Sequence, residues 1–228
     1  MYFSGHQKTS FIDYPDKIST VVFAAKCNFR CPFCHNSELV YGNGIRISEE
    51  YIFDYLQKRR TMIDSVCISG GECTLYDDID IFIRKVKKLG YLVKIDTNGT
   101  NPKLLAKLID EKLLDYIAMD IKAPIHKYDL LTGVKTNTEK ILESIQKIQN
   151  GKIDYEFRTT LCKELLNEED ILAIGRLLKG SKTYALQNFK DGDTILAGKN
   201  KFTPYGKEEL MHMKESIKDC FEVVKIRF

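Results

Sequence analysis

The chain has 228 residues, of which 43% are hydrophobic and 29% are charged, a composition typical of a globular protein with a buried core. The formal net charge of +3 is small for this length, so it gives no reason to expect nucleic acid or a membrane surface as the main partner. No apolar run approaches the ~18 residues of a membrane-spanning helix, and the amino terminus lacks the basic-then-apolar pattern of a secretion signal.

The cysteine content indicates a reducing compartment, and we expect the cytoplasm. Seven cysteines are an odd number, and three of them are closely spaced within residues 26–36. The others show no second paired spacing, so a disulfide framework is not expected. These remaining cysteines are Cys67, Cys73, Cys162 and Cys220.

Strand and helix patterns alternate along the whole chain without a linker or a low-complexity tract. The patterns predict strands at residues 18–25, 64–69, 91–96, 114–119, 153–160 and 183–189. They predict helices at about 48–60, 78–89, from 101 onward, and at 138–149, 168–178 and 207–217. Residues 221–228 add a terminal strand or an extension, so that 207–228 form a carboxyl-terminal helix and extension. The alternation predicts one α/β domain over residues 1–228, built as a partial (β/α)6 barrel.

Three cysteines follow the first predicted strand directly, in the segment Lys26 to Asn36. Cys27, Cys31 and Cys34 have the spacing C-x3-C-x2-C. Their thiolates can bind three irons of a [4Fe–4S] cluster, which normally takes four cysteines, and the fourth iron is then open to another ligand. The alternatives are a zinc site completed by His35 and a purely electron-transferring cluster. Zinc is disfavoured because side chains of adjacent residues diverge.

Polar motifs follow the next predicted strands at their carboxyl ends. They are Gly70-Gly71-Glu72, Asp96-Thr97-Asn98-Gly99, and Asp120 with Lys122; Arg158 lies within the fifth strand and Gln187 near the end of the sixth. Buried acidic groups at strand ends require partners, because an unpaired buried charge is costly. A simple turn at the two glycines, helix capping by Asn98 or Asn101, and an ordinary ion pair of Arg158 are structural alternatives.

The cysteine spacing, with Phe33 just before the last cysteine, resembles the signature of the radical S-adenosylmethionine (SAM) superfamily. The resemblance implies that SAM chelates the open iron, and that one electron from the cluster splits the sulfonium to release a 5′-deoxyadenosyl radical. It also implies an open (β/α)6 barrel with the cluster inside its mouth. The residues expected to contact SAM are Phe33, Gly70, Gly71, Glu72, Asp96, Thr97, Asn98, Asp120, Lys122, Arg158 and Gln187.

Two details of this resemblance concern single positions. The family usually has proline after the glutamate of its Gly-Gly-Glu motif, where this chain has Cys73. In addition, Asp96, Thr97 and Asp120 resemble positions that hold a monovalent cation beside the SAM carboxylate in the formate-lyase activase. The same cation is therefore a candidate third cofactor here.

Several segments together resemble the glycyl-radical-enzyme activases, and most of all the anaerobic ribonucleoside-triphosphate reductase activating protein. They are Ser10 to Pro15, Cys34 to Asn36, Asp96 to Gly99, Ala118 to Lys122 and Arg158 to Thr160. The resemblance implies that the deoxyadenosyl radical takes a hydrogen from a glycine Cα of a partner enzyme, with flavodoxin or ferredoxin as electron donor. Docking is expected at mouth loops such as residues 122–133.

Other functions stay open at the level of the sequence. One alternative is a radical SAM enzyme that acts on a small molecule, as carboxy-deazaguanine synthase does. Another is the activase of a different glycyl radical enzyme, such as pyruvate formate-lyase. The last is an iron–sulfur electron carrier, which would have no need of the Gly-Gly-Glu and Asp-Thr-Asn-Gly stretches.

Overall fold

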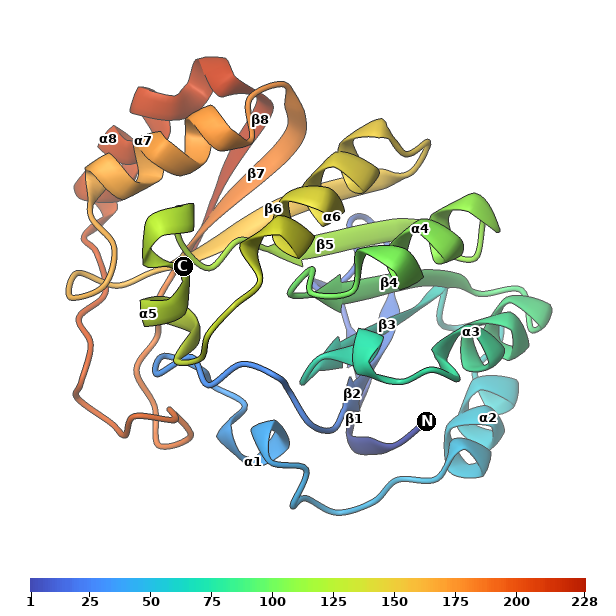
Figure 1. Cartoon of the computed structure of the whole chain (residues 1–228). Coiled ribbons are helices and arrows are strands. Elements are labelled where there is room, and N and C mark those ends of the chain that lie inside the picture. Colours follow the sequence, from blue (N-terminus) through green and yellow to red (C-terminus); the bar gives the residue numbers. More distant parts are fainter.

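One continuous sheet of eight strands forms the centre of the structure, a computed structural model that describes residues 1–228 (Figure 1). The strands are β1 (Phe3–Ser10), β2 (Ser19–Ala24), β3 (Ser65–Gly70), β4 (Leu92–Thr97), β5 (Tyr116–Asp120), β6 (Asp154–Leu161), β7 (Ser181–Asn188) and β8 (Phe221–Arg227). Their order in the sheet is their order in the chain. Strands β2 to β8 are parallel, and β1 is antiparallel to β2. Because β1 and β8 do not pair, the barrel is incompletely closed, which confirms the predicted α/β fold.

The helices connect successive parallel strands and lie on the outer side of the sheet (Figure 1). They are α1 (Ser37–Val40), α2 (Glu49–Lys58), α3 (Ile79–Lys88), α4 (Pro102–Asp110), α5 (Tyr128–Thr132), α6 (Thr138–Asn150), α7 (Glu168–Leu177) and α8 (Lys207–Ile217). Side-chain caps fix several starts: Ser48 accepts the N–H of Tyr51, and Asn101 accepts the N–H of Leu104. Of the two capping residues considered above, Asn98 and Asn101, it is Asn101 that caps α4.

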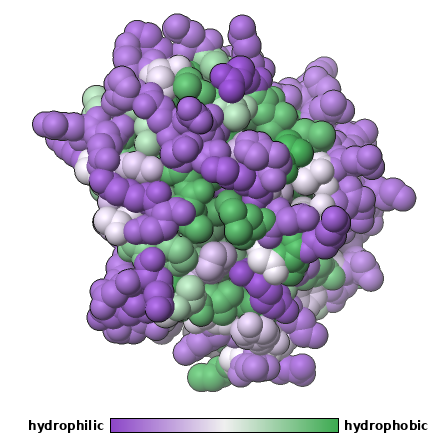
Figure 2. Space-filling view, turned by 60° about the vertical axis from the view of Figure 1, so that its left-hand side comes forward, coloured by the Kyte–Doolittle hydropathy of each residue, from purple (hydrophilic) through white to green (hydrophobic).

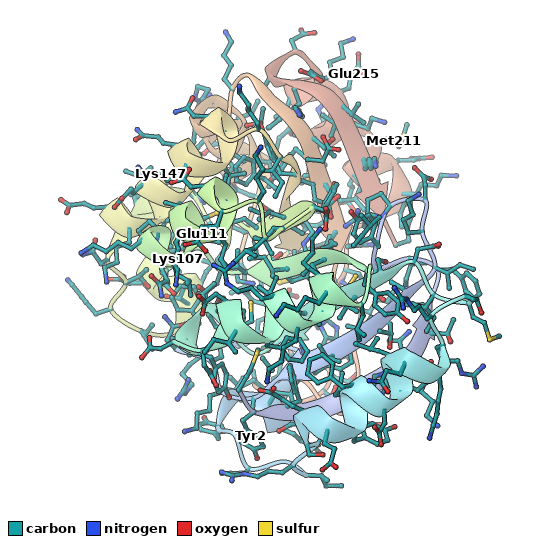
Figure 3. All side chains as sticks on the ribbon, turned by 90° about the vertical axis from the view of Figure 1, so that its right-hand side faces the viewer. Tyr2, Lys107, Glu111, Lys147, Met211 and Glu215 are labelled. Atoms are coloured by element: carbon teal, nitrogen blue, oxygen red, sulfur yellow. The ribbon has the colours of Figure 1, made fainter.

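Charged side chains occupy the outward surface of these helices. Lys107, Glu111 and Lys147 project from the α4 and α6 region in Figure 3. On the inward side, an extensive hydrophobic cluster fills the space between the helices and the sheet. Figure 2 shows, on another face, hydrophobic side chains gathered near the middle and hydrophilic ones around them. None of the helices has both the length and the apolar character that are needed to cross a membrane.

The six strands expected from the sequence correspond to β2 through β7, and the expected terminal strand is β8. Strand β1 was not expected, because its sequence, Phe-Ser-Gly-His-Gln-Lys-Thr-Ser, is mostly polar and shows no hydrophobic alternation. It is an edge strand with a single partner, β2, so little of its surface has to be apolar. The segment after it places Tyr14 against Tyr116, with ring centroids 5.8 Å apart.

The inner face of the barrel carries charged residues, whereas the outer face of the same strands is apolar. Along β4, Val93 and Ile95 belong to the hydrophobic cluster, while Lys94 and Asp96 line interior cavities. This alternation is the period of two that a strand imposes on its side chains. The fold therefore delivers polar groups from neighbouring strands into a common interior.

Candidate functional site

A single pocket at the carboxyl ends of the strands gathers all the residues that the sequence indicated. Its lining includes the three cysteines and every residue expected to contact SAM: Cys27, Cys31, Cys34, Phe33, Gly70, Gly71, Glu72, Asp96, Thr97, Asn98, Asp120, Lys122, Arg158 and Gln187. The structure therefore brings these residues together, while their contacts with a ligand stay predictions. The pocket also includes Phe29, His35, Asn36, Val40, Ser69 and Thr160, which the expected set lacked.

Backbone groups and Arg30 supply most of the hydrogen bonds that hold the cysteine loop, and the Cys27 thiol in addition accepts the N–H of Phe29 at 3.4 Å. The N–H of Cys27 donates to the carbonyl of Val40 at 3.1 Å, and the N–H of Cys34 donates to the carbonyl of Cys31 at 3.0 Å. Arg30 donates its N–H to the carbonyl of Thr132 in α5 at 2.7 Å, and its guanidinium donates to the carbonyl of Cys27 at 2.7 Å. The loop is thus preformed before any ligand binds.

Burial keeps the thiols of Cys27 and Cys31 protonated in the ligand-free chain. It raises the pKa of Cys27 to about 12 and that of Cys31 to about 11. Iron binds the thiolate form, so loading a cluster must release protons from these groups.

The three thiols fit an iron–sulfur cluster better than a single metal ion. They line one pocket, yet no three Cys, His, Asp or Glu side chains are arranged to hold one ion. Zinc ligands must converge on one point, whereas the cysteines of a [4Fe–4S] cube each bind a different iron. The donor set, three thiols on one loop beside an open pocket, therefore suits the cluster and not the zinc alternative.

The β7–α8 connector, residues 189–206, covers the cysteine loop and was not foreseen as part of the site. Leu196 donates its N–H to the carbonyl of Cys34, and Ala197 donates to that of Pro32, both at 3.0 Å. The ring of His35 contacts the carbonyl of Lys190 through Nε2 at 2.6 Å and packs on Phe189. This contact directs Nε2 of His35, the residue named above as a possible zinc ligand, to the connector.

Gly70 and Gly71 allow the end of β3 to approach the start of the cysteine loop. Gly70 has φ +103°, and a Cβ at Gly71 would lie 1.9 Å from the carbonyl oxygen of Lys26. The N–H of Gly71 donates to Ala24, and that of Glu72 donates to Lys26, both at 2.8 Å. Side chains at either glycine would force these segments apart.

Glu72 has a structural role that the sequence did not indicate. Its side chain is 0% exposed, and Oε1 accepts hydrogen bonds from the Thr74 N–H at 3.0 Å and from the Thr97 hydroxyl at 2.8 Å. Oε2 accepts from the N–H of Asn98 at 2.6 Å. The carboxylate thus joins the loops after β3 and β4. Because both of its oxygens have protein partners, the backbone of Glu72 is the part that is left for the predicted contact with SAM.

Glu72→Gln is expected to lower the free energy of unfolding by about 1–3 kcal/mol, because the new amide points N–H groups at donors that need an acceptor. Urea denaturation of the ligand-free chain measures the loss. Glu143→Gln, at an exposed position of α6, is the matched control and should change little. Equal stability of both variants would contradict the proposed role of the carboxylate.

A row of side chains of alternating charge on three neighbouring strands runs into the pocket, with Lys94 at its outer end. Lys94 Nζ lies 2.5 Å from Asp96 Oδ1, and Arg158 lies 3.4 Å from the other oxygen of that carboxylate. Arg158 Nε then donates to Asp120 at 2.8 Å, and Lys122 Nζ contacts Asp120 at 2.9 Å. The ion pair expected as the structural alternative for Arg158 is therefore present, within the pocket itself.

These contacts determine the ionisation of the two acids. Burial opposes ionisation of Asp96, but the charges of Arg158 and Lys94 outweigh it and lower the pKa of Asp96. Burial likewise opposes ionisation of Asp120, and Arg158 with Lys122 lowers its pKa. Burial disfavours the ammonium of Lys122, yet Asp120 and the nearby Cys31 raise its pKa. Asp96, Asp120 and Lys122 are therefore charged at neutral pH.

Asn98 and Cys73 act on their surroundings in different ways. Asn98 donates its amide to Asn28 Oδ1 at 2.8 Å and to Cys27 Sγ at 3.9 Å, so it positions the cysteine loop. Cys73 lies in the hydrophobic cluster, outside the pocket, and its thiol donates to the carbonyl of Asp96 at 3.4 Å. Burial raises the pKa of Cys73 well above its usual value, so it packs as a neutral side chain.

Comparisons with known proteins agree with this geometry. Residues 21–178 match the family model described as the Radical SAM superfamily. A Methanocaldococcus jannaschii protein named "Putative glycyl-radical enzyme activating enzyme MJ1227" is 36% identical, over 98% of this chain and 95% of its own length.

Two solved structures share the fold. Streptococcus suis SuiB bound to S-adenosylmethionine has a TM-score of 0.67 at 18% identity, covering 87% of this chain and 46% of SuiB. A domain of pyruvate-formate lyase-activating enzyme from Bacteroides vulgatus has a TM-score of 0.58 at 15% identity, covering 72% of this chain and 99% of that domain. At these identities the likeness concerns the fold alone.

Proposed function

This chain belongs to the radical SAM superfamily, and we propose that it is an activating enzyme for a glycyl-radical partner protein. The superfamily uses a [4Fe–4S] cluster and SAM, which when bound supply a 5′-deoxyadenosyl radical by one-electron cleavage of the sulfonium. The proposed reaction moves one hydrogen atom from a glycine Cα to that radical, giving 5′-deoxyadenosine, methionine and a glycyl radical on the partner. The proposed partner is anaerobic ribonucleoside-triphosphate reductase, with flavodoxin or ferredoxin as electron donor and the cytoplasm as location.

The observation that carries the proposal is the similarity, over nearly the whole length of both chains, to the M. jannaschii relative named as a glycyl-radical activating enzyme. A match confined to the cysteine loop would support only the superfamily. The activity is proposed for this chain because the similarity covers 95% of that relative's length.

The residues of the pocket have distinct proposed roles toward SAM. Lys122 lines the pocket beside the cysteines, and with Arg158 it offers positive charge to the SAM carboxylate. The backbone of Gly70 and Gly71 is proposed to bind the amino group. Phe33 supplies an apolar wall for the adenine, and Gln187 offers its amide at the edge of the pocket.

A second cavity extends the site toward another side of the barrel and supports a large substrate. It shares Arg158 and Gln187 with the first pocket. The rest of its lining is Ile12, Asp13, Pro15, Lys94, Glu156, Lys225, Arg227 and Phe228. Since β1 and β8 leave the barrel open, an extended segment of a partner protein has a route toward the cluster loop.

The docking surface expected at residues 122–133 is only partly available. Helix α5 within it packs on the cysteine loop, and Tyr128 and Leu131 are fully buried. Leu130 is 66% exposed and is the apolar side chain that this segment still offers to a partner.

The test is radical transfer to candidate partners encoded in the same genome. The chain is loaded anaerobically with iron and sulfide, reduced, and mixed with SAM and a partner labelled with deuterated glycine. We expect a glycyl-radical doublet in the electron paramagnetic resonance spectrum and deuterium in the released 5′-deoxyadenosine. A partner whose radical-site glycine is replaced by alanine is the control and should give neither.

Deuterium transfer to 5′-deoxyadenosine from a small molecule, with no signal on any partner protein, would contradict the activase proposal and support the alternative. Transfer from pyruvate formate-lyase and not from the reductase would keep the activase proposal and change the partner.

A further inference from the structure

The three residues that resemble a monovalent-cation site already have protein partners for their oxygen atoms. Asp96 accepts from Lys94 on one oxygen, and from Ser69 at 2.8 Å and Arg158 on the other. Asp120 binds Arg158 with one oxygen and Lys122 with the other.

Thr97 is engaged in the same way. Its hydroxyl donates to Glu72 at 2.8 Å and accepts the N–H of Gly99 at 3.1 Å. A free Na⁺ or K⁺ needs several oxygens at once, and here each of these oxygens faces a donor or a charged nitrogen. The residues therefore do not fit a free cation.

Lys94 is the unusual member of this arrangement. Its side chain is 2% exposed, and its only salt bridge is the one to Asp96, two residues further along the same face of β4. A buried ammonium without a partner is costly, so the pair with Asp96 is what makes this position tolerable. Lys94 lines the second cavity and not the cluster pocket, so it can act on a ligand in that pocket only through Asp96.

The five side chains in this row of ion pairs have a net positive charge. Lys94, Arg158 and Lys122 carry three positive charges, and Asp96 and Asp120 carry two negative ones, leaving a net charge of +1. One carboxylate of a bound amino acid moiety would neutralise it. The protein thus supplies from its own side chains the positive charge that an added cation would bring.

We propose that Lys94 and Arg158 replace the monovalent cation in this chain, so that SAM binds without Na⁺ or K⁺. Lys94 is then a positioning residue that holds the Asp96 carboxylate, and through it Arg158, in place. The inference rests on membership of the superfamily and not on the identity of the partner, so it stands or fails independently of the activase proposal.

The first measurement is the affinity of the anaerobic, cluster-loaded wild-type chain for SAM, by calorimetry. Chloride salts of K⁺, Na⁺ and the bulky tetramethylammonium are compared at equal ionic strength. We expect the dissociation constant to be the same in all three. Binding weaker by about tenfold in tetramethylammonium, the effect of losing one charged hydrogen-bond partner, would overturn the proposal.

The second measurement uses Lys94→Met, which removes the charge and keeps the length of the side chain. We expect SAM binding to weaken by about tenfold in tetramethylammonium and to recover in K⁺ or Na⁺. The melting temperature of the cluster-free variant should also rise with K⁺ or Na⁺ specifically, which a merely structural defect would not produce. Lys147→Met, on the outer surface of α6 (Figure 3), is the control. A Lys94→Met variant that binds SAM like the wild type in every salt would overturn the proposal.

Discussion

Cys31→Ala is expected to abolish cluster binding and SAM cleavage while leaving the fold intact. Cys31 is one of only three thiols in the pocket, so its loss leaves two ligands for a group that already lacks a fourth. The loop itself should persist, because most of its hydrogen bonds come from backbone groups and from Arg30. Iron and sulfide content after anaerobic reconstitution should fall to background, and 5′-deoxyadenosine should not form when dithionite and SAM are added.

The matched control for this experiment is Cys220→Ala. Cys220 is a half-buried cysteine just before β8 and does not line the pocket, so its variant should bind iron and cleave SAM like the wild type. Full iron content in Cys31→Ala, with an unchanged response of the cluster signal to SAM, would contradict the assignment of the cysteine loop. Zinc bound in a one-to-one ratio to the wild-type protein would instead support the zinc site as the function of these cysteines.

The grouping of the site residues could be predicted because the carboxyl ends of parallel strands lie at the same end of the sheet. Each polar motif lies in the carboxyl-terminal half of a strand or directly after it. The assignment of Asp96, Asp120 and Arg158 to one pocket needed only the order of the strands, which equals the order in the chain. Cysteine spacing added the position of the cluster loop.

Other features depend on contacts between distant segments, for which the sequence carries no local pattern. The connector reads as a series of turns, and its place over Cys34 is set by hydrogen bonds across more than a hundred and fifty residues. Glu72 reads as part of a ligand-binding motif, whereas its carboxylate is used between two loops. The ion pair between Lys94 and Asp96, in contrast, has a local sequence signal. The two residues are two positions apart in a predicted strand, so their side chains lie on the same face.

Arg158→Met is expected to lower the free energy of unfolding by about 1.5–3 kcal/mol at neutral pH, because it removes a charged partner from Asp96 and from Asp120, which are both partly buried. Arg158 contacts both carboxylates, so no other single substitution removes a partner from each of them. Urea denaturation of the cluster-free chain measures the effect. Arg176→Met, at an exposed position in α7, is the control and should stay near the wild-type value.

The pH dependence of this loss distinguishes lost charge pairing from lost packing. The pKa values of Asp96 and Asp120 are lowered in the folded chain, so their pairing contributes stability above the unfolded value of about 4, and that contribution fades as the pH falls through the folded values. The variant has less of this contribution to lose. The difference in the free energy of unfolding between the wild type and Arg158→Met should therefore become smaller as the pH is lowered below about 4. A gap that stays constant over this range would mean that Arg158 stabilises the fold through the packing of its aliphatic part, and that the two acids do not depend on its charge.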